Sequence, residues 1–108
     1  MKKIFIPIIS LLLILLITNC SIDKDPQIRV FNNSSTNVSF KIQTPGETDM
    51  MINDVAPGFS TEYHTSLIGN VTATAMVYNQ SVSFSTVMNN NYTITFSDTK
   101  PLAVVIEQ

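Results

Sequence analysis

The feature that most constrains this chain is an alternation of apolar and polar residues with a period of two, which begins near Gln27 and continues to the C-terminus. In the segment 70–78, for example, Val71 and Ala73 alternate with threonines. Successive side chains of a strand point to opposite faces, so this period predicts β-strands. The sequence after residue 20 carries no sustained i, i+3, i+4 stripe of apolar residues, and β-branched and aromatic residues are frequent. An all-β fold is expected.

Turn-forming residues divide this region into short segments. The strands are predicted at 27–31, 37–43, 50–55, 70–78, 81–87, 91–97 and 102–108. Seven or eight short strands in so small a domain predict an antiparallel, Ig-like β-sandwich. We expect the strand 70–78 to be central and the tightest hairpin turn to lie at 78–81. The apolar run 102–106 should be buried on both sides or paired deep in one sheet.

The N-terminus has the features of a secretory signal peptide. Lys2 and Lys3 precede a run, Ile4 to Ile17, that contains no charged residue. As a helix this run would be about 21 Å long, which is shorter than the roughly 30 Å hydrocarbon core of a bilayer. A cleaved signal is therefore favoured, and a retained membrane anchor is the alternative.

The only cysteine of the chain ends the sequence "ITNC", residues 17–20. This sequence resembles the lipobox of bacterial lipoproteins, although Asn19 stands where Gly, Ala or Ser is usual. The resemblance implies cleavage between Asn19 and Cys20 and lipidation of Cys20. A single cysteine in an exported chain cannot form an internal disulfide, and lipidation would remove the unpaired thiol. The alternative is that Cys20 is simply the last apolar residue of the signal.

These features predict three parts: a signal peptide at 1–19, a lipidated polar tether at 20–27 and a β-sandwich domain at 28–108. After cleavage, four basic residues would face eight acidic ones, which leaves a net charge of −4. An acidic chain without a basic patch is not expected to bind nucleic acid or to be attracted to anionic lipid, so membrane attachment would depend on Cys20.

The segment 28–97 also resembles a small bacterial β-sandwich family of unknown function, whose members occur in secreted or surface proteins. The resemblance is carried by Gly58, Tyr63, Gly69 and the pair Tyr92-Thr93. A loop "NNSSTN" stands where that family has an Asp- and Pro-rich one. Since the family has no established activity, the resemblance implies a fold and no reaction.

The sequence offers little for catalysis or metal binding. His64 is the only histidine and could share a strand face with Glu62, but a solvated histidine near a strand end is the favoured interpretation. Zinc would need more Cys and His ligands than the chain has. Calcium could use Glu47, Asp49 and Asp54, although their spacing matches no EF-hand. We therefore expect no enzyme activity, no cofactor and no metal.

Two adjacent apolar residues, Leu67 and Ile68, fall in a predicted loop. They are either a binding surface for a partner or, as we favour, a cap over the sandwich. The sequence thus predicts a lipid-anchored envelope protein that acts as a binding or structural interaction module, with another envelope protein as its candidate partner. Ser21, where some bacteria read Asp as an inner-membrane signal, favours the outer membrane or cell surface. The alternative is an exported ligand-binding or hydrolase-like domain with a loop-end site near His64.

Overall fold

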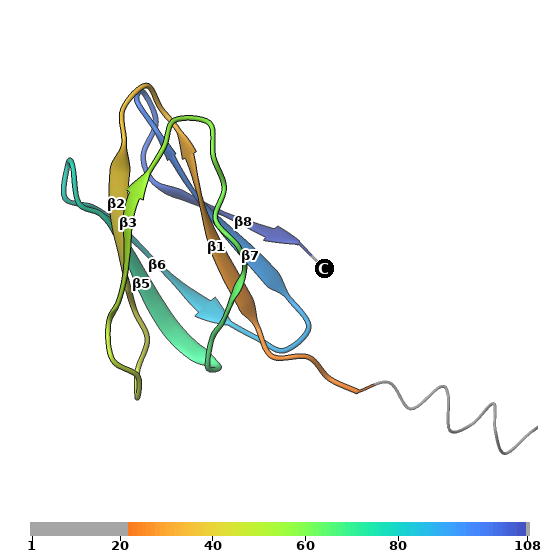
Figure 1. The fold of residues 1–108 in the computed structure, drawn as a ribbon. Helices are drawn as coiled ribbons and strands as arrows, with labels where there is room; N and C mark the ends of the chain where they lie inside the picture. Colours follow the sequence, from red (N-terminus) through yellow and green to blue (C-terminus); the bar gives the residue numbers. More distant parts are fainter. Residues whose placement is uncertain (1–21, 108) are drawn as a thin grey trace, which may run out of the picture.

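The computed structural model describes residues 22–107, and this part of the chain contains strands and no helix (Figure 1). Its eight strands are β1 (Gln27–Asn33), β2 (Val38–Gln43), β3 (Met50–Val55), β4 (His64–Thr65), β5 (Gly69–Ala75), β6 (Gln80–Thr86), β7 (Asn91–Ser97) and β8 (Ala103–Glu107). They form two four-stranded sheets that pack face to face. The expected all-β, two-sheet architecture is confirmed.

The two sheets have the strand orders β4-β1-β7-β8 and β3-β2-β5-β6, and are called sheet A and sheet B below. All pairs in sheet B are antiparallel. In sheet A, however, β1 runs parallel to β7 over its whole length, with Gln27 opposite Asn91 and Asn33 opposite Ser97. The expectation of a wholly antiparallel arrangement is wrong for this pair, because the period of two fixes which face a side chain occupies but not the direction of the neighbouring strand.

The core lies between the sheets and is built from the apolar positions of the alternating pattern. Each sheet contributes one buried row from each of its central strands. Sheet A contributes Ile28, Val30, Tyr92, Ile94 and Phe96, and sheet B contributes Val38, Phe40, Ile42, Val71, Ala73 and Ala75. Most of these side chains have no exposed surface. The small residues Ala73 and Ala75 of β5 are buried in the same core as large side chains from the other strands.

The prediction that the segment 70–78 is central is confirmed, since β5 lies between β2 and β6. The strand nevertheless ends at Ala75, three residues earlier than expected. The hairpin turn occupies 76–79 instead of 78–81, because Ala75 pairs with Gln80 and Asn79 adopts a positive φ of 52°. Met76, Val77 and Tyr78 are therefore exposed turn residues.

The prediction for the apolar run 102–106 is wrong. Leu102 is buried, but β8 pairs only with β7 and forms an edge of sheet A. Val105 and Ile106 are each at least half exposed. An edge strand lacks a neighbour on one side, so a continuous apolar run does not guarantee burial on both faces.

A buried asparagine joins the two sheets at the end farthest from the N-terminal segment. Asn32, at the end of β1, has no exposed surface. Its amide donates to the carbonyls of Thr36 and Val55, at 2.7 and 2.8 Å, and its Oδ1 accepts from the backbone and hydroxyl of Ser34. All the bonding capacity of the side chain is used, which is what burial of a polar amide requires.

Candidate functional site

The residues of the predicted lipidation site, Asn19 and Cys20, lie outside the described residues, as does the whole predicted signal peptide. Cleavage and lipidation therefore stay predictions. Within 22–107, no helix is long and apolar enough to cross a membrane.

The N-terminal segment that would follow the lipidated cysteine is bonded to the sandwich. The backbone N–H of Lys24 donates to Oδ1 of Asn89, and the N–H of Asn89 donates back to the Lys24 carbonyl, both at 2.8 Å. The amide of Asn89 also donates to Asp23 at 3.2 Å. Pro26 is buried, and its carbonyl accepts from the N–H of Ser66. We call these contacts the tether clamp; they hold residues 23–26 against the loops before β5 and β7.

The structure leaves Leu67 and Ile68 exposed in the loop between β4 and β5, at 48% and 60% of their surface. The favoured interpretation of a buried cap is therefore wrong for both. The loop is hydrogen-bonded to the end of β6. The Thr86 hydroxyl donates to the Leu67 carbonyl at 2.8 Å and accepts from the N–H of Gly69. An exposed apolar pair on a loop that is hydrogen-bonded to the sandwich is a surface that a partner or a lipid could cover.

Two further apolar side chains lie in segments joined to this loop. Val87 follows Thr86 and is 50% exposed, and Ile22 precedes the tether clamp and is 88% exposed. We call Ile22, Leu67, Ile68 and Val87 the tether-end apolar set. Sequence reasoning found only two of its members, because the other two are single apolar residues in separate polar segments and the fold alone brings those segments together.

His64 and Glu62 do not form a recognisable catalytic group. His64 lies on β4, where it pairs with Ile28 and is half-buried, and Glu62 is exposed in the preceding loop. A general base needs a positioned partner and a nucleophile within hydrogen-bond reach. No hydrogen bond or ion pair of either side chain is present in the part of the chain that the structure describes.

The three carboxylates considered for calcium are not gathered into one site. Glu47 and Asp49 belong to the β2–β3 loop, whereas Asp54 lies at the other end of β3. Asp49 forms an exposed ion pair with Lys41 at 3.6 Å. Among residues 22–107, no group of three or more His, Cys, Asp or Glu residues could hold a metal ion.

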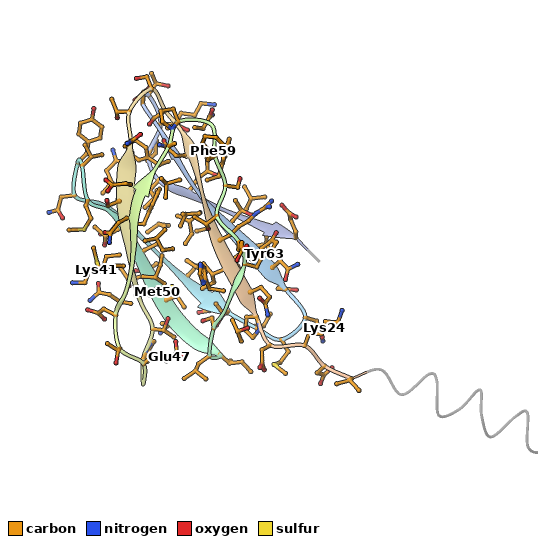
Figure 2. All side chains as sticks on the ribbon, viewed as in Figure 1. Lys24, Lys41, Glu47, Met50, Phe59 and Tyr63 are labelled. Carbon is orange, nitrogen blue, oxygen red and sulfur yellow. The ribbon has the colours of Figure 1, made fainter. Side chains whose placement is uncertain are left out.

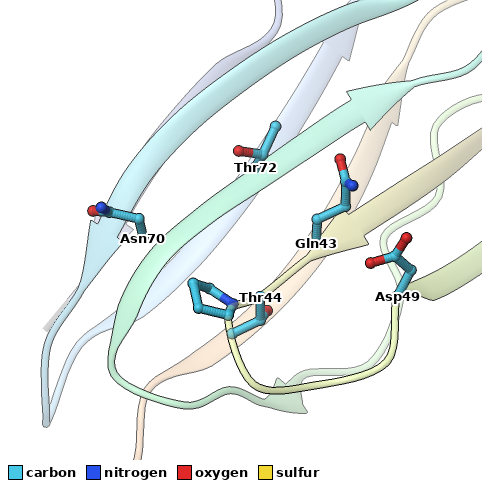
Figure 3. A pocket seen from close by; sticks show the side chains of 6 residues that line it. Gln43, Thr44, Asp49, Asn70 and Thr72 are labelled. Atoms are coloured by element: carbon cyan, nitrogen blue, oxygen red, sulfur yellow. The ribbon is translucent and has the colours of Figure 1, made fainter.

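An open depression lies where β2 runs into the β2–β3 loop beside the start of β5, and Figure 3 shows it from close by. It encloses about 430 Å³ and is lined by Gln43, Thr44, Pro45, Asp49, Asn70 and Thr72. Amide and hydroxyl groups dominate its walls, and the one carboxylate already faces Lys41. The depression can donate and accept hydrogen bonds, but it does not combine a nucleophile with a base.

The depression shares Gln43, Asn70 and Thr72 with a larger group of polar side chains on the outside of sheet B. Three cross-strand pairs between β5 and β6 are hydrogen-bonded: Asn70 with Ser85, Thr72 with Ser83 and Thr74 with Ser81, at 2.7 to 2.9 Å. Gln43 and Lys41 of β2 lie in register with Thr72 and Thr74. We call this surface, formed by Lys41, Gln43, Asn70, Thr72, Thr74, Ser81, Ser83 and Ser85, the polar face of sheet B.

The polar face of sheet B was not predicted as a site, although its signal is visible in the sequence. Threonine or serine occupies every second position in "VTATA" of β5 and in "SVSFS" of β6. Such spacing predicts only that these residues share one face of their strand. The antiparallel register, which the sequence does not specify, sets the hydroxyl groups opposite one another and produces the bonded rows.

Comparison of the chain with protein-family models, curated proteins and solved structures finds no match. The resemblances to bacterial lipoproteins and to a small β-sandwich family therefore stay predictions.

Proposed function

We propose that this protein is a lipid-anchored component of a bacterial envelope, attached through Cys20, whose β-sandwich acts as a binding or structural interaction module without catalytic activity. The observation that carries the proposal is the sequence "ITNC" placed directly before a folded domain. Only two residues separate Cys20 from Asp23, the first residue of the tether clamp. By the same proposal the fold is Ig-like in the broad sense of two packed sheets of short strands, and the outer membrane or cell surface is its location.

The polar face of sheet B and the adjoining depression support the interaction role. Six of the eight side chains of the polar face are short, uncharged and already paired across strands, so little side-chain entropy is lost when a partner covers them. The edge strands of the same sheet, β3 and β6, offer unpaired backbone groups to which a partner strand could bond. These features suit a partner protein that presents a flat, hydrogen-bonding surface, and they supply no group that would cleave a bond.

The anchor is tested by the intact mass of the protein recovered from the detergent phase of its native host. We expect a mass equal to residues 20–108 plus acyl chains, and incorporation of a labelled fatty acid. The variant Cys20→Ser should lose the label, whereas Ser21→Ala should retain it. A full-length, unmodified mass would instead identify the first 19 residues as a retained membrane segment and would contradict the proposal.

The interaction role is tested by site-specific photo-crosslinking in the native host. A photoreactive residue at Ser83 samples the polar face of sheet B, and the same residue at Val105, on β8 of sheet A, is the control. We expect a reproducible crosslinked envelope protein from position 83 that position 105 does not give. Equal or absent crosslinking from both positions would argue against this face as the binding surface.

A further inference from the structure

The tether clamp leaves almost no linker between the proposed anchor and the sandwich. Asp23 is the first residue bonded to the domain, through Asn89. The three steps from Cys20 to Asp23 span at most about 11 Å when fully extended. The headgroup layer on one side of a bilayer is roughly 6 Å thick, so a lipidated Cys20 would hold this end of the sandwich within a side chain's length of the membrane.

The end that is held there carries the tether-end apolar set. Its four side chains are all about half exposed or more, and they come from three segments: the N-terminal segment, the β4–β5 loop and the β6–β7 loop. Hydrogen bonds join these segments, from Ser66 to Pro26, from Thr86 to Leu67 and between Asn89 and Lys24. Single exposed apolar residues are ordinary. These four lie in segments that meet where the N-terminal segment joins the domain, so a membrane at that end could cover them together.

The charges near this surface indicate which kind of membrane it would contact. Asp23 and Asp25 flank Lys24, so the segment has no cationic excess that would attract anionic lipid. Attraction must then come from the apolar side chains, which bind the boundary between headgroups and acyl chains and are little affected by salt. A zwitterionic bilayer suits this combination.

We propose that the sandwich does not hang from a flexible tether but rests on the bilayer, with Ile22, Leu67, Ile68 and Val87 in the interfacial layer. This inference rests on the proposed lipid anchor at Cys20. It fixes the orientation of the domain: the β5–β6 turn, which contains Val77, faces away from the membrane. Phe59, like that turn, lies at the end opposite Lys24 (Figure 2).

The test uses one engineered cysteine in the processed, acylated protein, residues 20–108, since the thiol of Cys20 is consumed by its lipid. Ile68→Cys places a fluorophore in the apolar set, and Val77→Cys is the matched control at the other end of β5. The seven residues of β5 separate the two positions by roughly 23 Å, and both side chains are exposed. The protein is reconstituted into phosphatidylcholine vesicles that carry a quencher in the upper part of the acyl chain.

We expect loss of fluorescence and a blue-shifted emission at position 68, neither at position 77, and no change of this pattern in high salt. Replacing Leu67 and Val87 by serine should reduce the quenching at position 68 while the mass of the anchor is unchanged. If the protein is acylated but not quenched at position 68, the proposed contact of the domain with the bilayer is wrong and the lipid anchor still holds. A mass without acyl chains would overturn both.

Discussion

Asn32 and Val55 connect the two sheets through one hydrogen bond of 2.8 Å, from the buried amide of the first residue to the backbone carbonyl of the second. Asn32 belongs to β1 of sheet A, and Val55 ends β3 of sheet B. The backbone of Asn32 also bonds the loop that follows β3, since its N–H donates to Phe59 and its carbonyl accepts from Gly58. The side chain and the peptide groups of Asn32 therefore hold the segment after β3 at the point where it passes from sheet B to β1 of sheet A.

Replacing Asn32 by alanine should lower the free energy of unfolding by about 3 kcal/mol, because several buried groups lose their partners at once. Urea unfolding measures the change. The matched control is Asn33→Ala, since Asn33 is the next residue of β1 and is exposed, and its loss should change stability by less than about 0.5 kcal/mol. Equal effects of the two substitutions would contradict the linking role of Asn32.

The hydroxyl of Tyr92 should stabilise the connection between β6 and β7. Tyr92 is buried at the start of β7, and its hydroxyl accepts from the N–H of Val87 at 2.9 Å. Tyr92→Phe keeps the ring and removes the hydroxyl, which also accepts a longer bond of 3.4 Å from the amide of Asn90, so we expect a loss of about 1 kcal/mol in thermal or urea unfolding. Tyr78→Phe, at an exposed tyrosine, is the control and should have little effect. No difference between the two would mean that water replaces the tyrosine oxygen at Val87.

The core should be most sensitive at Phe40, which has no exposed surface and lies on a central strand of sheet B. Phe40→Ala should lower the free energy of unfolding by about 4 kcal/mol through lost burial and a cavity. If that variant is too unstable to measure, Phe40→Leu should still fold and lose about 1 kcal/mol. Phe59→Ala removes an exposed ring and should change the unfolding midpoint little; a comparable loss there would show that Phe59 is covered in solution.

Substitutions of Asn89 can distinguish the contribution of its side chain to the tether clamp from the effect of backbone strain. This residue has a φ of 69°, a conformation that asparagine and glycine tolerate better than alanine. In Asn89→Gly the amide of Lys24 should lose its protection from hydrogen exchange, while overall stability changes by less than about 0.5 kcal/mol. Asn89→Ala should lose the same protection and a further 1 kcal/mol or so from strain. Unchanged protection of Lys24 in both variants would mean that the side chain does not hold the segment.

Much of the fold could be predicted from the sequence, because the core is made of the residues that alternate. Phe40 and Ile42 fall on the same face whatever the strand order, and both are buried. The order itself depends on backbone pairing between segments far apart in the chain, which side-chain pattern does not encode. That is why the parallel pair of β1 and β7 and the edge position of β8 were not anticipated. The strand β4 has only two residues, too few to show a period.

The site was less predictable than the fold. Leu67 and Ile68 could be singled out because two apolar residues in a loop are conspicuous, but their exposure depends on how Thr86 holds that loop. The tether clamp joins Lys24 to Asn89 across 65 positions, through polar residues that look like ordinary loop residues. Contacts of this kind leave no local signal. Cys20 is the reverse case: its prediction depends on the sequence alone.

The parallel pairing of β1 with β7 also determines the order in which the domain can be completed. Sheet B uses only residues from 38 to 86, so its strands can pair as soon as that stretch has been synthesised. β1 comes first in the chain, yet its main partner comes second to last, and loops that must close over such separations slow folding. The edge of β1 that bonds to β7 therefore stays unpaired until nearly the whole chain has been synthesised. A truncation before residue 91 would leave β1 with only the two-residue β4 and the loop before it, which bonds to Val30, Phe31 and Asn32, to pair with.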